Sequence, residues 1–374
     1  MMLSLRDFWR RHRRKVFVTV GIVGSGYAFY RLYFAHKERL DALEREFEGQ
    51  READEHIKAQ LQLHFENIQR ISDSATLPYV LRNLRSRLFE ELDFSQLMER
   101  LMHGKGQPNI LTSQEKLELW ERLKILSFTR TASSLWATTI LNLYIRVQVN
   151  ILGRHLYVDT ARGLEISFSQ DEAEPLDRLG QHEFLASANY LSDCNISSLI
   201  LDMQSAATDI LKEKHLRDPF TMADLHDTFA RMLQSFMSGP HHWVNYIVPE
   251  TASAYKELTP ASSHIGESLH PSATGKLEQL VVETRAVLAS DDFSRVAEIA
   301  LKNVTDGVME EVRPHFDGGS SNGIPLAKIL ARVAQLSSDL LEEPSRNRYI
   351  HIIRSLPEVE LFYRLLYANM PLAP

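Results

Sequence analysis

The residue types that most often carry catalysis are thinly spread along this chain of 374 residues. Its 15 histidines are scattered, and in the adjacent pair His241-His242 the side chains diverge, which disfavours a shared metal ion. The single cysteine, Cys194, is better interpreted as a small core residue than as a reactive thiol. No C-x-x-C, H-E-x-x-H or phosphate-binding G-x-x-x-x-G-K-[ST] motif occurs. We therefore predict no catalytic residues, metal ions or cofactors, and expect a binding protein rather than an enzyme.

A glycine-rich run between Val20 and Phe29 resembles the strand-to-helix turn of a dinucleotide-binding fold. Such a turn needs glycines where backbone amides approach a pyrophosphate, and a small residue where helix and strand pack together. Phe29 occupies the position of that small residue and is too large for the contact. We predict no nucleotide site, and expect Gly21 and Ser25 to let the segment pack against another helix.

The first 34 residues join a basic cluster to an apolar segment. The cluster comprises Arg10, Arg11, Arg13, Arg14 and Lys15, and the apolar segment runs from Val16 and Phe17 to Tyr30. As a helix the segment spans roughly 22 Å, and about 28 Å if it continues through Arg31 to Phe34, close to the thickness of a hydrocarbon core. We predict that residues 1–34 form a targeting segment and a single transmembrane helix, followed by a second domain at 35–374.

A secretory signal peptide also begins with a basic region and a short apolar core. Tyr33, Phe34 and His36 are too bulky for its cleavage site, and one cysteine provides no disulfide framework for export. The anchor is the preferred interpretation.

Charge is divided unevenly along the chain. The 42 basic and 49 acidic residues give a net charge of −7, yet residues 1–39 hold nine basic residues and only two acidic ones. The basic end is suited to membrane lipids, whereas the acidic remainder would be repelled by phosphate. We predict contact with membrane lipids and no binding of nucleic acid.

Hydrophobic periodicity predicts helices through the rest of the chain. Apolar residues recur at steps of three and four, and no run alternates with the period of a strand. The expected helices cover residues 38–71, 77–92, 95–102, 113–152, 179–214 (two helices broken near 192–195), 221–237, 273–289, 292–312, 325–342, 345–355 and 358–370. A capping box at Thr112 and Glu115 opens the helix 113–152, and Gly153 is expected to end it. Four prolines in 239–271 indicate a surface excursion. The predicted fold class is all-α, an elongated bundle of long helices with one N-terminal transmembrane helix.

The beginning of the helix 113–152 carries apolar side chains on two sides. At about 100° per residue, one arc holds Leu119, Trp120, Leu123 and Leu126, and a nearly opposite arc holds Leu117, Ile125 and Phe128. Such a helix needs two neighbours, either two helices of the same chain or one helix from a partner. Trp120 lies at the edge of its arc beside Lys124, which is typical of a groove that accepts an amphipathic helix. Both interpretations stay open on the pattern alone.

The stretch Lys116–Arg130 and its continuation through Arg146–Gly153 to Tyr157-Val158-Asp159 resemble the peroxisomal biogenesis factor 3 (peroxin 3) family. So do the basic-then-apolar start, His64-Phe65-Glu66-Asn67 and Ile324–Ile329. The resemblance covers the whole chain in order, is most specific from Lys116 to Asp159 and is weak in 165–320. It implies a single-pass protein of the peroxisomal membrane whose helical domain faces the cytosol.

The resemblance also implies a partner, peroxin 19, the soluble receptor that carries newly made peroxisomal membrane proteins. An amphipathic helix of that partner would enter a groove that contains Trp120 and Leu123 and is bordered by Lys328. We expect Leu119 beside them, and Lys328 with Lys124 to select an acidic flank of the partner. The alternative for Lys328 is an ordinary solvated lysine in the first turn of its helix.

Two further expectations concern topology and function. The positive-inside rule would keep Arg10–Lys15 in the cytosol, whereas the resemblance implies that this terminus lies in the organelle lumen, and we follow the resemblance. The alternative function is a tether on the organelle surface for inheritance or cytoskeletal adaptors.

Overall fold

The computed structural model describes residues 72–106, 112–165, 178–239, 241–250, 271–316 and 323–368, together with Leu63, Glu66, Asn67, Gln69 and Arg70. The chain divides into two units, residues 1–64 and 65–374, and the elements below belong to the second. The predicted anchor at 1–34, its boundary at residue 35 and the predicted helix 38–71 up to residue 62 lie outside the described residues. No helix in the described part is both long and apolar enough to cross a membrane.

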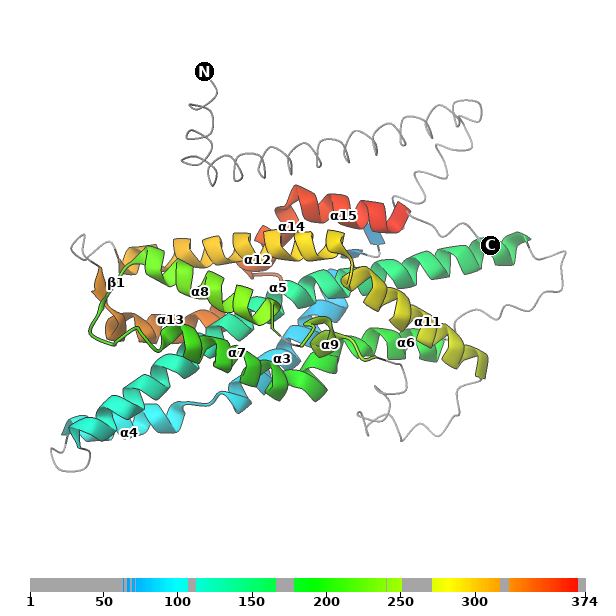
Figure 1. Ribbon diagram of the computed structural model, residues 1–374. Helices are drawn as coiled ribbons and strands as arrows, with labels where there is room; N and C mark the ends of the chain where they lie inside the picture. Colours follow the sequence, from blue (N-terminus) through cyan, green and yellow to red (C-terminus); the bar gives the residue numbers. More distant parts are fainter. Residues whose placement is uncertain are drawn as a thin grey trace, which may run out of the picture. The chain divides into compact units, whose positions relative to one another are not determined.

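The described part is predominantly helical, which confirms the all-α part of the predicted class (Figure 1). Short π and 3-10 segments occur at Ser72–Thr76, Ser187–Asn189, Leu191–Asn195 and Arg313–His315. The α-helices are α3 (Leu77–Glu91), α4 (Ser95–Gly106), α5 (Ser113–Glu165), α6 (Arg178–Ala186), α7 (Ile196–Leu211), α8 (Met222–Met237), α9 (Val244–Ile247), α11 (Pro271–Leu288), α12 (Asp291–Val312), α13 (Leu326–Leu340), α14 (Arg348–Ser355) and α15 (Pro357–Ala368). They match the predicted helices to within a few residues, apart from the end of α5 and from α9, which was not predicted. The prediction that 239–271 is a surface excursion is wrong for residues 243–248, because Val244, Tyr246 and Ile247 of α9 are buried.

The second unit is built around α5, which Figure 1 shows running between the other helices. At 53 residues it is about 80 Å long. Helices α13, α7, α12, α15 and α11 pack along it, and every side chain from Ser127 to Ile145 is buried. This explains why α5 lacks a single apolar face: a helix covered on all sides needs none.

Two threonines within the buried part of α5 bond to backbone carbonyls of α13. Thr131 Oγ1 donates to the Val333 carbonyl at 2.6 Å, and Thr138 Oγ1 donates to the Leu340 carbonyl at 3.1 Å. Both pairs are 202 residues apart in the sequence. Because the offset is constant, α5 and α13 run parallel, and the first residue of α13, Leu326, lies level with Lys124.

The prediction that Gly153 ends α5 is wrong, because the helix continues to Glu165. Gly153 is buried, and beyond it Arg154 and His155 both form ion pairs with Glu283 of α11. A glycine in a helix costs about 1 kcal/mol, which packing and ion pairs of this kind outweigh. Similarly, α4 runs to Gly106 rather than ending near Met102.

Two strands that the periodicity did not predict lie between α7 and α8 and before α13. β1 (Pro219–Phe220) pairs antiparallel with β2 (Ile324–Pro325). Gly323, just before β2, has a φ of 83°, and an added Cβ would lie 2.9 Å from the Phe220 carbonyl oxygen. This close crossing fixes the start of α13 against the segment that follows α7.

Candidate functional site

The first turns of α5 pack against α4 and form a hydrophobic cluster separate from the main core. Leu97 and Leu101 of α4 meet Leu119 and Leu123 of α5 in this cluster, and each is at most 9% exposed. We call α4 together with residues 113–126 of α5 the tip, and the helices packed around residues 127–152 of α5 the body. The sequence predicted that two neighbours cover the beginning of α5. For Leu119 and Leu123, the neighbour is α4 of the same chain.

Capping bonds define the ends of the two tip helices. Asp93 Oδ1 accepts from the Ser95 backbone N–H at 2.9 Å at the start of α4, and bonds from Ser95 hold the pKa of Asp93 below its usual range. At the start of α5, Thr112 N–H donates to Glu115 Oε2 at 2.7 Å, and Glu115 N–H donates to Thr112 Oγ1 at 3.2 Å. This confirms the predicted capping box, and these bonds lower the pKa of Glu115.

Trp120 lies between the two cores. It is partly buried and packs against both the tip cluster and the main core. At about 100° per residue it falls on α5 between Leu123, which faces α4, and Lys124, which faces the end of α7. One turn before it, Leu117 is 55% exposed. The tip thus leaves apolar side chains uncovered on the side of α5 where the body helices have ended.

Lys124 is not on the surface, contrary to what its predicted role requires. It is 2% exposed, and its Nζ donates to the carbonyls of Leu211 at 3.2 Å and Lys214 at 2.6 Å and pairs with Glu121 at 2.5 Å. A buried ammonium group with three acceptors has no free donor to select an acidic partner. The prediction that Lys124 contacts a partner therefore does not fit its position.

Lys328 is exposed, in the first turn of α13. Given the parallel register of α5 and α13, Lys328 lies level with residue 126 of α5, about 9 Å from Trp120 along the helix axis. The structure therefore brings Trp120 and Lys328 to the same end of the unit as surface groups, and places Leu119, Leu123 and Lys124 beneath that surface.

Sequence reasoning missed the contribution of α4 and of the joint before it. Phe94 and Met98 are partly buried against the tip cluster, and the Arg130 guanidinium stacks 4.3 Å from the Phe89 ring and 4.1 Å from the Phe94 ring. Burial lowers the pKa of Arg130 to about 10, so the group stays protonated at neutral pH. The spacing of Phe94, Leu97, Met98 and Leu101 is the signal that could have placed α4 on α5.

The structure offers little catalytic chemistry elsewhere. No group of histidine, cysteine and acidic side chains among the described residues could hold a metal ion. Burial and the neighbouring Asp193 raise the pKa of Cys194, which keeps it a thiol. His242 stacks on Trp243, with ring centres 5.8 Å apart. These groups serve packing.

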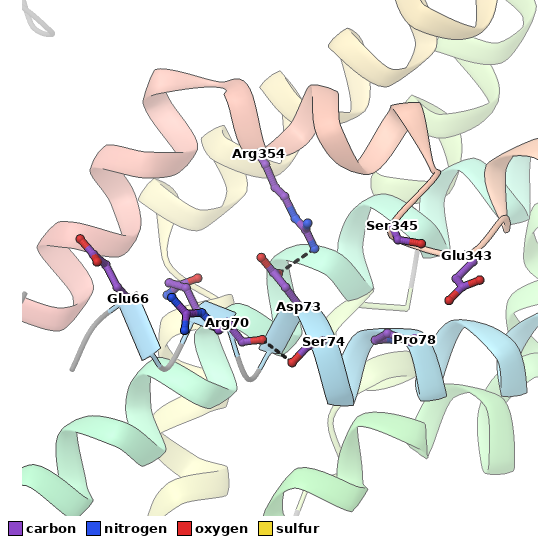
Figure 2. Close-up of a pocket in the computed structure, with 9 residues that line it drawn as sticks. Glu66, Arg70, Asp73, Ser74, Pro78, Glu343, Ser345 and Arg354 are labelled. Carbon is purple, nitrogen blue, oxygen red and sulfur yellow. Dashed lines mark hydrogen bonds and ion pairs between the residues drawn. The ribbon is translucent and has the colours of Figure 1, made fainter. Parts of the chain in front are cut away.

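An open hollow of about 560 Å³ lies near the start of α3, at the opposite end of that helix from α4. Figure 2 shows Asp73 and Arg354 directed at one another across it, 2.7 Å apart. Burial raises the pKa of Asp73 even though Arg146 and Arg354 favour its charged form. The pair ties η1 (Ser72–Thr76) to α14 and is interpreted as structural.

A model of the family described as Peroxin-3 matches residues 102–369, a range that includes all of α5, the strand pair and α13. The chain belongs to the Peroxin-3 family. Among curated relatives of this family, peroxisome biogenesis protein 3-2 of Arabidopsis thaliana is 49% identical over 98% of this chain and 99% of its own length. Peroxisome biogenesis protein 3-1 of the same plant is 47% identical over 98% and 99%. Human peroxisomal biogenesis factor 3 is 28% identical over 98% and 97%.

The Peroxin-3 match confirms the resemblance drawn from Lys116–Asp159 and extends it across the region where sequence motifs were weak. The relatives are named for peroxisome biogenesis and not for a reaction. The anchor residues Arg10, Arg11, Arg13, Arg14, Lys15, Val16, Phe17 and Tyr30 lie outside the described residues, and their role stays a prediction.

Proposed function

We propose that this protein acts in peroxisome biogenesis as a docking receptor on the peroxisomal membrane for peroxin 19, which carries newly made membrane proteins. The observation that carries the proposal is the partly buried indole of Trp120 at the edge of the tip cluster, with Leu117 55% exposed one turn away. A large aromatic side chain at the edge of a packed cluster is the usual centre of a protein interface.

The occupant we propose is an amphipathic helix of peroxin 19. Its apolar face would cover Trp120 and Leu117, which lie at the adjoining edges of the two apolar arcs and only about 60° apart around α5. Met98 of α4 packs against the same tip cluster as Trp120. Exposed Lys328 would attract an acidic residue on the flank of that helix. In this proposal Leu119 and Leu123 do not contact the partner; they are buried under Trp120 and hold it and α4 in position.

The test measures binding of a fluorescein-labelled peptide from the N-terminus of peroxin 19 to the full-length chain in detergent micelles. We expect Trp120→Ala to weaken binding by roughly 2–4 kcal/mol, as truncation of a central aromatic residue does. Leu117→Asp is a second variant, and it should have little effect on the stability of the fold because Leu117 is exposed. Tyr79→Ala is the matched control, because Tyr79 is an aromatic residue 63% exposed on α3. Unchanged affinity in both Trp120→Ala and Leu117→Asp would refute the docking proposal.

We further propose that residues 1–34 anchor the protein as a single span, with the helical unit in the cytosol and the basic terminus in the lumen. The basic-then-apolar pattern of Arg10–Tyr30 supports the span, and the orientation follows the family resemblance rather than the positive-inside rule. Protease treatment of intact organelles that carry an N-terminal tag tests this orientation. Protection of the tag is the expected result, and digestion would mean the opposite topology.

A further inference from the structure

The ammonium group of Lys124 joins α5 to a segment that is distant in the sequence, the end of α7 and the turn that follows it. It belongs to α5, and its two carbonyl partners, Leu211 and Lys214, lie 87 and 90 residues further along the chain. Its third partner, Glu121, is one turn away on α5. An ammonium group has three hydrogens to donate, so these three acceptors fill its capacity.

The carbonyl groups that Lys124 binds mark the end of α7. Leu211 is the last residue of that helix, and Lys214 lies in the turn that follows. The last carbonyls of a helix lack partners within it and carry the negative end of its dipole. The Leu211 carbonyl also accepts from the Lys214 N–H at 3.1 Å, so the buried cation from α5 adds a second bond there. It offsets the negative end of the α7 dipole and fixes that end against α5, one turn from Trp120.

The same turn also supports the start of α13. The Leu216 carbonyl accepts from the Ala327 N–H at 3.0 Å, and the Asp218 carbonyl accepts from the Leu326 N–H at 3.2 Å. Those are the first two residues of α13, and Lys328 is the third. A short chain of hydrogen bonds thus runs from Lys124, through residues 211–218, to the backbone that carries Lys328.

We propose that Lys124 is a positioning residue of the docking surface: by fastening the end of α7, and with it the first turn of α13, to α5, it sets the location of Lys328 relative to Trp120. This inference rests on the proposed function. A partner helix whose acidic flank matches that spacing can engage the indole and the ammonium group together. A helix with its acid elsewhere can engage only one of them.

The test measures how the effect of Lys328→Ala depends on Lys124, with the labelled peptide and the full-length chain in micelles. In the native chain we expect Lys328→Ala to weaken binding about fivefold and to reduce its salt dependence. In a Lys124→Met background, binding should already be about tenfold weaker, and Lys328→Ala should then change it less than about twofold, because contacts in one network do not add.

Two variants separate positioning from general loss of stability. Thr138→Val removes another hydrogen bond between α5 and α13, about 27 Å from Trp120 along α5, and should leave the peptide affinity and its salt dependence unchanged. Lys124→Arg keeps a cation with several donors at the end of α7 and should restore part of the affinity that Lys124→Met loses.

The outcomes are distinguishable. If Lys328→Ala keeps its full effect in the Lys124→Met background, the positioning role is wrong while docking stands. If Trp120→Ala and Leu117→Asp both leave the affinity unchanged, docking itself fails. Should thermal unfolding show that Lys124→Met does not fold, Lys124→Gln, which retains one donor near the two carbonyls, is measured with the same two criteria.

Discussion

The tip and the body use the same helix, α5, in different ways. In the body, residues 127–145 are buried on every side, including serines and threonines that bond to neighbouring carbonyls. In the tip, α4 covers Leu119 and Leu123, while Leu117 stays exposed and Trp120 stays partly covered. The contrast shows that the exposure of an apolar residue on a long helix depends on how many neighbouring helices cover that part of the helix, and not on the residue type alone.

The largest expected effect is on the free energy of unfolding, and it comes from comparing the tryptophan of the body with that of the tip. Trp136 is fully buried, meets Phe236 edge-on at 5.2 Å and donates its indole N–H to Met237 Sδ at 3.1 Å. Trp136→Ala should lower the free energy of unfolding by about 3–5 kcal/mol. Trp120→Ala should lower it by less than about 2 kcal/mol, because Trp120 is only partly buried. Urea unfolding followed by circular dichroism measures both, and equal losses would contradict the distinction.

The next prediction concerns the small cluster that holds the tip together. Leu123 is 4% exposed between α5 and α4. Leu123→Ala should lower the free energy of unfolding by about 2–3 kcal/mol through the cavity that it leaves. Hydrogen exchange should accelerate in α4 and leave the buried amides of residues 132–145 protected. Faster exchange throughout the body would mean that tip and body unfold as one unit.

A backbone change at the joint between the two regions should have a somewhat smaller effect. Gly323→Ala places a Cβ 2.9 Å from the Phe220 carbonyl at a φ of 83°, which should cost about 1–2 kcal/mol in the free energy of unfolding. Gly275→Ala is the control, since an added Cβ in α11 meets nothing within 4 Å. It should leave stability unchanged or raise it by about 1 kcal/mol. Equal effects of the two substitutions would exclude the proposed close crossing.

The smallest expected effect is a pH dependence of stability that arises in the body between about pH 4 and 6. Asp339 and Glu311 share Arg332, and Tyr349 donates to Glu311. Burial, followed by the hydrogen bond and charge of Glu311, raises the pKa of Asp339 to about 6 from its ordinary 3.8. Burial opposes the ionisation of Glu311 as well, but hydrogen bonds from Tyr349 and Asp339 and the charge of Arg332 outweigh it and lower the pKa of Glu311.

A raised folded pKa means that protonated Asp339 favours the folded state below about pH 4, and that this contribution is lost as the pH rises through 6. Asp339→Asn, which cannot ionise, should therefore match the native protein near pH 4 and exceed its stability above pH 6. Solvent screening at this partly exposed group limits the difference to about 1 kcal/mol. Unfolding at pH 4, 5, 6 and 7 measures it, and a difference that does not change with pH would contradict it.

The helices were largely predictable because their apolar residues recur at helical spacing and their caps are local. Thr112 with Glu115 is an example, and so is Thr221, whose side chain accepts from the Asp224 N–H at 3.1 Å. The end of α5 was predicted wrongly at Gly153, because the prediction considered only the low helix propensity of glycine. It could not include Glu283, the distant partner of Arg154 and His155.

The candidate site was predictable in part. The position of Trp120 at the edge of its arc indicated partial exposure, and periodicity left Lys328 off the apolar seam of α13. The burial of Lys124 could not be predicted from the sequence, because its two carbonyl partners lie about 90 residues away. Every residue has a backbone carbonyl, so no residue type identifies these two as partners. The packing of α4 over Leu119 and Leu123 could not be predicted either, because it depends on the path of the chain between α4 and α5.

The unbroken course of α5 through tip and body has a consequence for chain length. A single residue inserted between the buried stretch and Trp120 would turn the tip by about 100° and advance it by about 1.5 Å relative to every helix of the body. The indole would then point elsewhere, although no contact of either region had been mutated. We therefore expect insertions and deletions to be tolerated in the connections between helices, and not in α5 between Trp120 and the buried stretch, whose length sets the direction of the indole.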